Sequence, residues 1–305
     1  MRIIFMGTPQ FAVASLDALI TAGCDVVAVI TAPDKPAGRG QKVNESAVKQ
    51  YAVANHLKVL QPEKLKNPDF LKELEALKAD LQVVVAFRML PQVVWSMPQK
   101  GTINLHASLL PQYRGAAPIN WVLINGEKES GVTTFFLKQE IDTGDILFTE
   151  KVTLTGQETA GELHDRLMAK GAGLLVKTVK AIESGRYQEH PQTQIIIESE
   201  LQHAPKLTKE LGIIDWTQPV EKIYNLIRGL SPTPAASTKL NDKILKIYRA
   251  EYQQTEPAIQ PGGFLTDNKT SLKFAAADGF ILPTDVQLEG KKRMGIEEFL
   301  RGVKL

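Results

Sequence analysis

The stretch NLHASLLPQYRG, residues 104–115, continues the apolar run 102–105 and contains groups that bind an oxyanion or carry a proton. Asn104 and His106 lie two residues apart, so in an extended strand their side chains leave one face while Leu105 points to the other. An amide is a neutral donor for an oxyanion, and an imidazole exchanges a proton near neutral pH. The pair therefore indicates acyl-type transfer, which needs a third group to orient or charge the imidazole.

Asp142, in the segment EIDTGD, is the best candidate for that third group because it lies in a turn between two expected strands. The alternative is a purely structural turn residue, since Asp side chains often bond their own backbone in turns. The triplet Asp-Thr-Gly also resembles the aspartic-protease signature, but that chemistry needs two such carboxylates in an all-β fold, and the chain has one such triplet. We therefore expect Asp142 to act on His106, which taken alone would more often be a structural histidine.

Ser108 raises the question of a serine nucleophile. The chain lacks the Gly-x-Ser-x-Gly elbow around it, so we expect no nucleophilic role. The residues that follow, Leu109 to Pro111, are apolar and suit the lining of a flat organic ligand. Arg114 either faces that ligand or forms a surface ion pair.

The size and composition indicate a soluble two-domain protein. At 305 residues the chain exceeds most single domains, so we expect two cores. No apolar run reaches the roughly 18 residues that span a membrane, and MRIIFMGTPQ turns polar too early for a signal peptide. We therefore expect a cytoplasmic protein. Cys24 is the single cysteine, which excludes an internal disulfide and argues against a zinc site, so no metal is expected.

Short apolar runs alternate with helical periodicity over the first third of the chain. Strands are expected at residues 2–7, 25–31, 58–62, 81–87 and 101–108, and helices at 9–23, 46–56, 67–79 and 91–98. This alternation predicts an α/β fold with a Rossmann-like, mostly parallel sheet that binds ligands beyond the carboxyl ends of its strands. A dinucleotide is not expected, because MGTPQFA offers one glycine where the fingerprint needs three. Gly7 is expected to let the backbone turn at the end of the first strand.

The pattern changes after residue 130. Strands expected at 131–138 and 146–154 are joined by a hairpin-like connection, and a long helix at 159–185 follows. The composition then becomes polar, and we expect a linker at 190–205.

This linker divides the chain into a catalytic domain, residues 1–189, and a second domain, residues 206–305. In the second domain, closely spaced strands with Gly and Asp turns predict a small β-barrel, with an OB-like five-stranded barrel as one candidate. After residue 205, Lys and Arg outnumber Asp and Glu by 15 to 12, whereas before it they number 21 against 22. This excess permits nucleic-acid contact without requiring it.

The segment NLHASLLPQYRGAAPI followed by IDTGD resembles the folate-dependent formyltransferases, whose mark is Asn-x-His, then Ser-Leu-Leu-Pro, then a distant Asp. Members with different acceptors share this motif, so it indicates the chemistry and not the acceptor. Four further stretches, RIIFMGTPQFA, DKPAGRGQK, APKLTKE and IRGLSPTPAA, resemble the members whose acceptor is methionyl initiator tRNA. The similarity covers essentially the whole chain.

The resemblance implies that the acceptor amine attacks the formyl carbon of 10-formyltetrahydrofolate, a co-substrate, without a metal. Asn104 would donate to the oxyanion, His106 would stabilise it or accept a proton, and Asp142 would orient His106 or a water. The residues expected to line the folate are Phe87, Arg88, Leu90, Ser108, Leu109, Leu110 and Pro111. Plain core packing is the alternative for the two leucines at 109 and 110.

The chain departs from the family pattern at two places. Arg88 stands where the family often has Gly, so the folate-side loop is expected to differ there. The sequence PTPAA at residues 232–236 replaces the frequent Pro-Trp-Pro-Gly-Ala, which concerns packing more than chemistry.

The resemblance also implies contacts with the tRNA. DKPAGRGQK, residues 34–42, is expected to be a flexible positive loop that orders on the acceptor stem through Lys35, Arg39 and Lys42. Candidate phosphate contacts in the second domain are Lys243, Lys246, Arg249, Lys291, Lys292 and Arg293. A basic run at a turn is usually solvated surface, which is the alternative for these residues. Strand alternation places Lys246 and Tyr248 on one face.

Other functions stay open at this point. A formyltransferase acting on a sugar-nucleotide amine would use the same three catalytic groups but would not need the basic loop. An RNA-binding protein without catalysis would give no reason to keep Asn104, His106 and Asp142 together. Formate release to water alone would indicate a hydrolase. We expect a monomer.

Overall fold

The computed structural model describes residues 1–37, 42–194 and 201–303. The chain folds into two compact units. The first comprises residues 1–114, 131–152 and 164–202, and the second comprises residues 115–130, 153–163 and 203–305. The segments 115–130 and 153–163 are expected from the sequence in the first domain, whereas in the structure they pack with the second unit.

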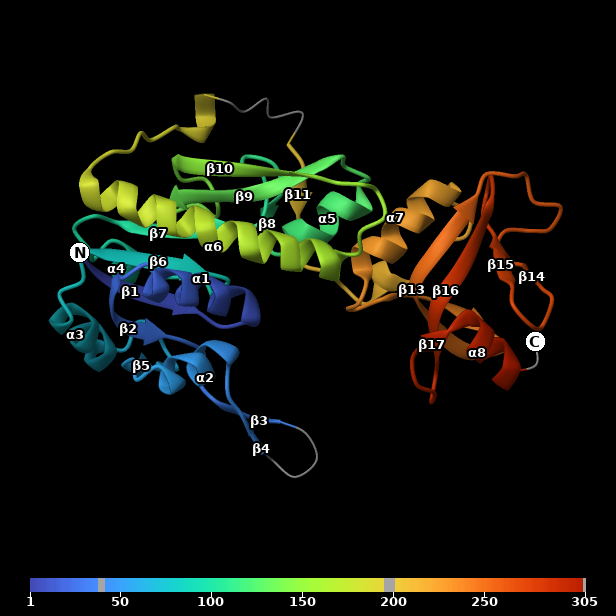
Figure 1. Cartoon of the computed structure of the whole chain (residues 1–305), viewed down its shortest axis with the longest axis horizontal. Coiled ribbons are helices and arrows are strands. Elements are labelled where there is room, and N and C mark those ends of the chain that lie inside the picture. Colours follow the sequence, from blue (N-terminus) through green and yellow to red (C-terminus); the bar gives the residue numbers. More distant parts are fainter. Residues whose placement is uncertain (38–41, 195–200, 304–305) are drawn as a thin grey trace. The chain divides into compact units, whose positions relative to one another are not determined.

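A seven-stranded sheet forms the centre of the first unit (Figure 1). Its strands are β1 (Arg2–Gly7), β2 (Asp25–Ile30), β5 (Val59–Leu60), β6 (Leu81–Val85), β7 (Thr102–His106), β9 (Glu129–Phe136) and β10 (Ile146–Thr153). Their order is β10-β9-β7-β6-β1-β2-β5. The five strands from β7 to β5 pair in parallel, and β9 joins β7 antiparallel. The strand order reverses direction at β1, where β2 and β6 lie on its two sides, and ligands of such sheets bind beyond this point.

Helices cover both faces of this sheet (Figure 1). They are α1 (Gln10–Thr21), α2 (Ala47–Ala54), α3 (Pro68–Ala76), α4 (Gln92–Trp95) and the long α6 (Ala160–Ser184). On one face, buried residues of α3 and α4 form a core with side chains of β1, β2 and β6. On the other face, Gly171 of α6 lies so close to β7 that a Cβ there would meet Leu105 Cδ2 at 2.8 Å. The strands are therefore buried on both sides, as their continuous apolar runs predict.

Gly7 is the last residue of β1. It does not adopt a left-handed backbone; instead, a Cβ at this position would lie 2.6 Å from Ala12 Cβ and 3.0 Å from Val85 O. The missing side chain therefore allows α1 to approach β1 and β6 closely.

Several pairings were not predicted from the sequence. Part of the segment DKPAGRGQK forms a two-stranded ribbon, β3 (Lys35–Ala37) with β4 (Lys42–Asn44), where a loop without strands was expected. Arg39 lies outside the described residues. The short strands β8 (Arg114–Gly115) and β11 (His203–Ala204) also pair, and the second of them lies in the expected linker.

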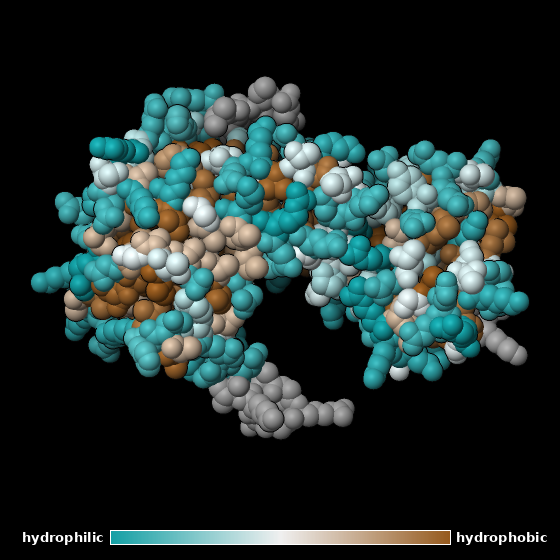
Figure 2. Space-filling view, in the orientation of Figure 1, coloured by the Kyte–Doolittle hydropathy of each residue, from teal (hydrophilic) through white to brown (hydrophobic). Residues whose placement is uncertain are grey.

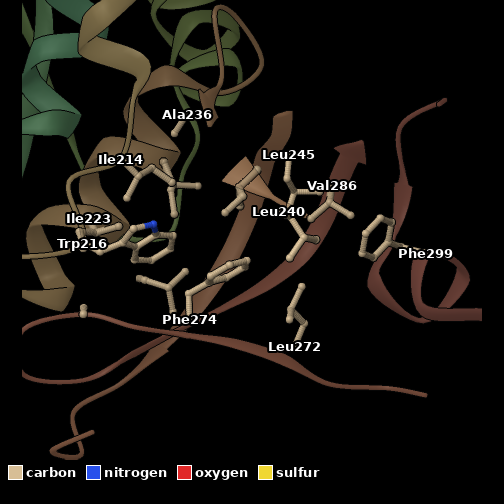
Figure 3. Close-up of a cluster of buried hydrophobic side chains, with 14 of the residues drawn as sticks. Ile214, Trp216, Ile223, Ala236, Leu240, Leu245, Leu272, Phe274, Val286 and Phe299 are labelled. Carbon is tan, nitrogen blue, oxygen red and sulfur yellow. The ribbon is translucent and has the colours of Figure 1, made fainter. Parts of the chain in front are cut away.

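The second unit contains an antiparallel, curled sheet of six strands (Figure 1). The strands are β12 (Ala236–Leu240), β13 (Lys243–Gln253), β14 (Phe264–Thr266), β15 (Leu272–Ala275), β16 (Phe280–Leu288) and β17 (Met294–Gly295), and the helices are α5 (Pro118–Ile124), α7 (Val220–Leu230) and α8 (Ile296–Gly302). Trp216 stacks on Phe274 with ring centroids 4.9 Å apart in the core of this unit (Figure 3). The predicted fold class, a mostly parallel α/β sheet domain followed by a small β domain, is confirmed. The second domain, expected as a small β-barrel with a five-stranded OB-like barrel as one candidate, has an antiparallel, curled sheet of six strands.

Among the residues that the structure describes, no helix has both the length and the apolar character needed to span a bilayer.

Candidate active site

Strand β7 positions Asn104 and His106 on one face of the sheet. Asn104 lies opposite Val84 of β6 and Phe135 of β9, and His106 lies opposite Thr133 of β9. The residue between them, Leu105, is buried on the opposite face, against α6. The strand and the alternation predicted from the sequence are both present.

His106 has a polar neighbour at each ring nitrogen. Its Nε2 is 2.9 Å from the carbonyl oxygen of Tyr113, which only accepts, so Nε2 carries a proton and donates it. Its Nδ1 is 3.7 Å from Asp142 Oδ2, an ion-pair distance that exceeds that of a direct hydrogen bond. The two side chains are only 8% and 11% exposed. Nδ1 is therefore the ring atom left to exchange a proton, and it lies beside a carboxylate.

Asp142 reaches His106 because β9 lies next to β7 and the β9–β10 connection follows it directly. Phe136 N donates to Asp145 O at 3.1 Å and closes this connection, as the expected hairpin requires. Asp142 itself has a left-handed backbone with φ 55°, a region that Asp tolerates better than most residues. A Cβ at Gly144 would lie 1.5 Å from Phe136 O, so the turn requires glycine there. The backbone of this turn thus explains why Asp is tolerated at position 142 and why Gly is required at position 144.

The Asn104 amide is free to bind a ligand. It is half-buried, and no hydrogen bond from it to another residue is present in the described part of the chain. An amide donor on the same strand face as an imidazole is the arrangement that stabilises a developing oxyanion.

The loop after β7 is fixed by hydrogen bonds to its own backbone and to β9. Ser108 is fully buried and its hydroxyl donates to Gln112 O at 2.6 Å, which leaves no nucleophilic role for it. Thr133 Oγ1 donates to Ser108 O at 2.7 Å and accepts from Leu110 N at 3.3 Å. Thr133 was not identified from the sequence, because a threonine in a strand carries no distinctive pattern.

The apolar residues of this loop differ in burial. Leu110 is buried against Phe135 and Ile146, which is core packing. Leu109 is half-buried and packs on Gly131, while Pro111 remains half-buried. Leu109 and Pro111 are therefore the members of this stretch with surface left for a ligand.

The loop after β6 supplies further apolar surface. Phe87 is half-buried beside the sheet core, Leu90 is buried, and Met89 between them is 73% exposed. Ile141, next to Asp142, is 58% exposed. Such exposed apolar side chains on loops at the carboxyl ends of strands fit the binding of an organic ligand.

Arg88 uses its guanidinium for structure. Its Nη1 donates to Glu63 O at 2.8 Å, its Nη2 donates to Pro62 O, and the Phe87 ring lies 5.5 Å from its Cζ. Burial lowers the pKa of Arg88. The side chain thus holds the segment after β5, and its predicted part in folate binding stays a prediction.

The basic residues predicted to contact tRNA lie in the β3–β4 ribbon and in the second unit. Lys35 is exposed on β3, and Lys42 begins β4. Arg249 pairs with Glu162, and Arg293 donates to Asp285 and lies 4.2 Å from the centre of the Tyr248 ring.

The lysines of the second unit are freer. Lys243, Lys246, Lys291 and Lys292 are exposed, and none forms an ion pair within the described residues. Figure 2 shows hydrophilic residues over most of the visible face of this unit. Tyr248 donates to Gln287, the residue opposite Lys246. The pairing of β13 with β16 shifts register between Ile247 and Arg249, so the predicted regular alternation is interrupted at Tyr248, which is buried whereas Lys246 is exposed.

Comparison with known proteins identifies a family. Residues 1–179 match the formyl transferase family, and residues 206–304 match the formyl transferase C-terminal domain. A methionyl-tRNA formyltransferase of Bacteroides fragilis is 51% identical over 310 residues, which cover 100% of this chain and 96% of the relative. A methionyl-tRNA formyltransferase of Parabacteroides distasonis is 54% identical over 311 residues, with the same two coverages.

Solved structures share the fold at lower identity. The N-formyltransferase of Helicobacter canadensis, in complex with folinic acid and dTDP-3-aminofucose, matches with a TM-score of 0.68 and 23% identity, over 92% of this chain and 98% of that chain. HypX of Aquifex aeolicus in complex with tetrahydrofolic acid matches with a TM-score of 0.63 and 21% identity, over 100% of this chain and 48% of that chain. At these identities the likeness concerns the fold alone.

Proposed function

The chain belongs to the formyl transferase family, and we propose that it transfers the formyl group of 10-formyltetrahydrofolate to the α-amino group of methionyl initiator tRNA. The assignment of the acceptor rests on the sequence identity of 51–54% along the full chain to methionyl-tRNA formyltransferases. The geometry of Asn104, His106 and Asp142 supports the chemistry, because it combines an oxyanion donor with a proton carrier and a carboxylate.

In this reaction the amine attacks the formyl carbon, which becomes tetrahedral while its oxygen gains negative charge. When the intermediate collapses, the bond between this carbon and N10 of the folate breaks, N10 takes up a proton, and tetrahydrofolate leaves. Asn104 donates a hydrogen bond to that oxygen. His106, whose Nε2 keeps its proton and donates it to Tyr113 O, uses Nδ1 to stabilise the charge or to take the proton released by the amine. Asp142 holds the imidazole, or a water between them, in place across 3.7 Å.

The donor would bind against the loops after β6 and β7 and the β9–β10 connection. Phe87, Met89 and Ile141 offer apolar surface for a pterin ring, and Leu109 and Pro111 add to it. The formyl group arrives on the co-substrate, so the chain needs only to bind, orient and polarise it.

The function is tested by the choice of acceptor. We expect the native chain to transfer formyl from 10-formyltetrahydrofolate to methionyl initiator tRNA, and to neither free methionine nor an aminoarabinose nucleotide.

An Arg39→Ala variant tests the β3–β4 segment, because Arg39 lies between its two strands in sequence. We expect it to weaken transfer by about tenfold, the loss of one charged contact of about 1.4 kcal/mol.

Transfer to the sugar nucleotide alone would agree with the proposed roles of the catalytic groups, but it would show that the acceptor is not methionyl initiator tRNA. Release of formate to water without any acceptor would instead indicate a hydrolase.

The exposed lysines of the second unit predict a salt dependence. Changing Lys291 and Lys292 together to Ala should reduce the slope of log affinity for tRNA against log salt by about 1–2, because each lost phosphate contact lowers it by about 0.7–0.9. Filter binding across a salt series measures the slope. The matched control is the pair Lys66→Ala and Lys72→Ala, two exposed lysines of the first unit, which should leave the slope as in the native chain. Equal slopes for native and Lys291/Lys292 variants would remove this turn from the tRNA footprint.

A further inference from the structure

The segment after α6, expected to be a linker at 190–205, is tied to both loops of the candidate active site. His190 exchanges two backbone hydrogen bonds of 2.9 Å with Ile146, at the start of β10. Further along, Gln202 N donates to Gln112 Oε1 at 2.8 Å and Gln202 O accepts from Tyr113 N at 2.7 Å. The described ends of this segment therefore contact the Asp142 loop on one side and the Tyr113 loop on the other.

Gln192 is the centre of these contacts. It is 1% exposed, and its amide uses every group that it offers. Its Nε2 donates to Asp142 O at 2.9 Å and to Gly144 O at 2.8 Å. Its Oε1 accepts from Arg114 Nε at 3.1 Å and from Arg114 Nη2 at 2.6 Å. A buried amide with all its bonds made fixes the groups around it in one arrangement.

The two carbonyls that Gln192 binds flank the turn that carries the Asp142 side chain. Asp142 has a left-handed backbone at φ 55°, a conformation that persists where its surroundings hold it. The carbonyls of Asp142 and Gly144 converge on one NH₂ group, which fixes this turn. The Asp142 carboxylate then lies 3.7 Å from His106 Nδ1.

The Gln192 amide also binds the loop that contains Tyr113 and Arg114. Arg114, which binds Gln192 Oε1, directly follows Tyr113, whose carbonyl accepts from His106 Nε2. Burial lowers the pKa of Arg114, while the charges of Asp142 and Glu140 oppose this. Gln192 thus links the loop that carries Asp142 to the loop that holds His106.

We propose that Gln192 is a positioning residue for formyl transfer, which sets the Asp142 carboxylate against His106 by binding the carbonyls of Asp142 and Gly144 while Arg114 holds its oxygen. The proposal rests on the proposed function. It assigns a part in the reaction to a segment that the sequence indicates only as a linker.

The first test is Gln192→Met, which keeps the length of the side chain and removes all four hydrogen bonds. We expect kcat for formyl transfer to fall by about 10–100-fold, because a misplacement of about 1 Å at a catalytic group has effects up to this size. The KM values of folate and tRNA should stay within about threefold, since a side chain that is 1% exposed offers almost no surface to either ligand. The control is Gln194→Met, an exposed neighbour in the same 3-10 turn, which should retain the native kcat.

A double-mutant cycle separates positioning from general stability. In an Asp142→Asn background, Gln192→Met should lower kcat by less than about threefold, because the carboxylate that it positions is already gone. Equal losses in the native and Asp142→Asn backgrounds would mean that Gln192 acts independently of Asp142, and the proposal would be wrong.

A second variant covers the case in which Gln192→Met does not fold. Gln192→Glu keeps an acceptor oxygen for Arg114 but points the other carboxylate oxygen at the two carbonyl oxygens of Asp142 and Gly144. The variant should therefore loosen the turn that carries Asp142 while retaining the contact with Arg114. Hydrogen exchange of the amides in residues 140–145 should become faster in this variant than in the native chain, whatever the acceptor. Unchanged exchange together with native kcat would overturn the proposal. A native chain that transfers no formyl group to tRNA would instead overturn the proposed function, while the exchange result would still decide the role of Gln192.

Discussion

Replacement of Asn104 by Ala is expected to lower kcat for formyl transfer by about 10²–10³-fold, because one oxyanion donor contributes about 2.7–4 kcal/mol to the stability of the transition state. The amide is half-buried and forms no hydrogen bond to another residue in the described part of the chain, so its removal leaves no buried group unpaired. The free energy of unfolding should therefore change by less than about 1 kcal/mol.

Single-turnover kinetics with saturating folate and charged tRNA measure this effect without the contribution of product release. The matched control is Asn55→Ala, the same chemical change at an exposed helix end, which should keep kcat within about twofold because such surface changes are small. A loss below tenfold in a folded Asn104→Ala variant would show that the oxyanion is stabilised elsewhere.

The position of Asn104 and His106 was predictable because it depends on local rules. An apolar run indicates a buried strand, and the two-residue period of a strand puts both side chains on one face. The α/β class follows in the same way from alternating apolar runs and helical segments. Even the hairpin of Asp142 has a local signal, since a turn with Asp and Gly lies between two strands.

The contacts that complete the site have no such signal. Gln192 meets Asp142 through side-chain to backbone bonds, which any glutamine makes when tertiary packing brings a carbonyl within reach. The polar composition around it suggests a linker, although the same polarity supplies the donors and acceptors that tie the segment down. The β3–β4 ribbon is too short for strand periodicity to appear.

Whether a charged surface residue has an ion-pair partner also depends on the tertiary structure. Arg249 and Arg293 look like phosphate ligands in the sequence, yet the structure pairs them with Glu162 and Asp285. The hydrogen bonds that Arg293 donates to Asp285 raise the pKa of Arg293, so this guanidinium stays charged but already has a partner. Lys291 and Lys292 lack such partners among the described residues, and they remain the stronger candidates for tRNA contact.

Replacement of Asp142 by Asn is expected to lower kcat by about 10²–10⁴-fold, the range assigned to positioned proton transfer, while leaving the fold intact. Asn keeps the shape of Asp and also tolerates the left-handed backbone, φ 55°, at this position. The two hydrogen bonds from Gln192 go to backbone carbonyls of the turn and persist in the variant. The change therefore removes the negative charge beside His106 Nδ1, a charge that also counteracts the lowering of the Arg114 pKa by burial.

Asp145→Asn provides the comparison that isolates this charge. Asp145 lies in the same connection and pairs with Lys138 at 2.7 Å, and its backbone carbonyl, which accepts from Phe136 N, is unaffected by the substitution. An exposed ion pair of this kind contributes about 0–1 kcal/mol to stability, so this variant should keep kcat within about threefold. Equal losses in both variants would mean that the net charge of the loop matters and that the contact with His106 does not. A large loss confined to Asp142→Asn would assign the effect to the one carboxylate that the turn, Gly144 and Gln192 together hold against the imidazole.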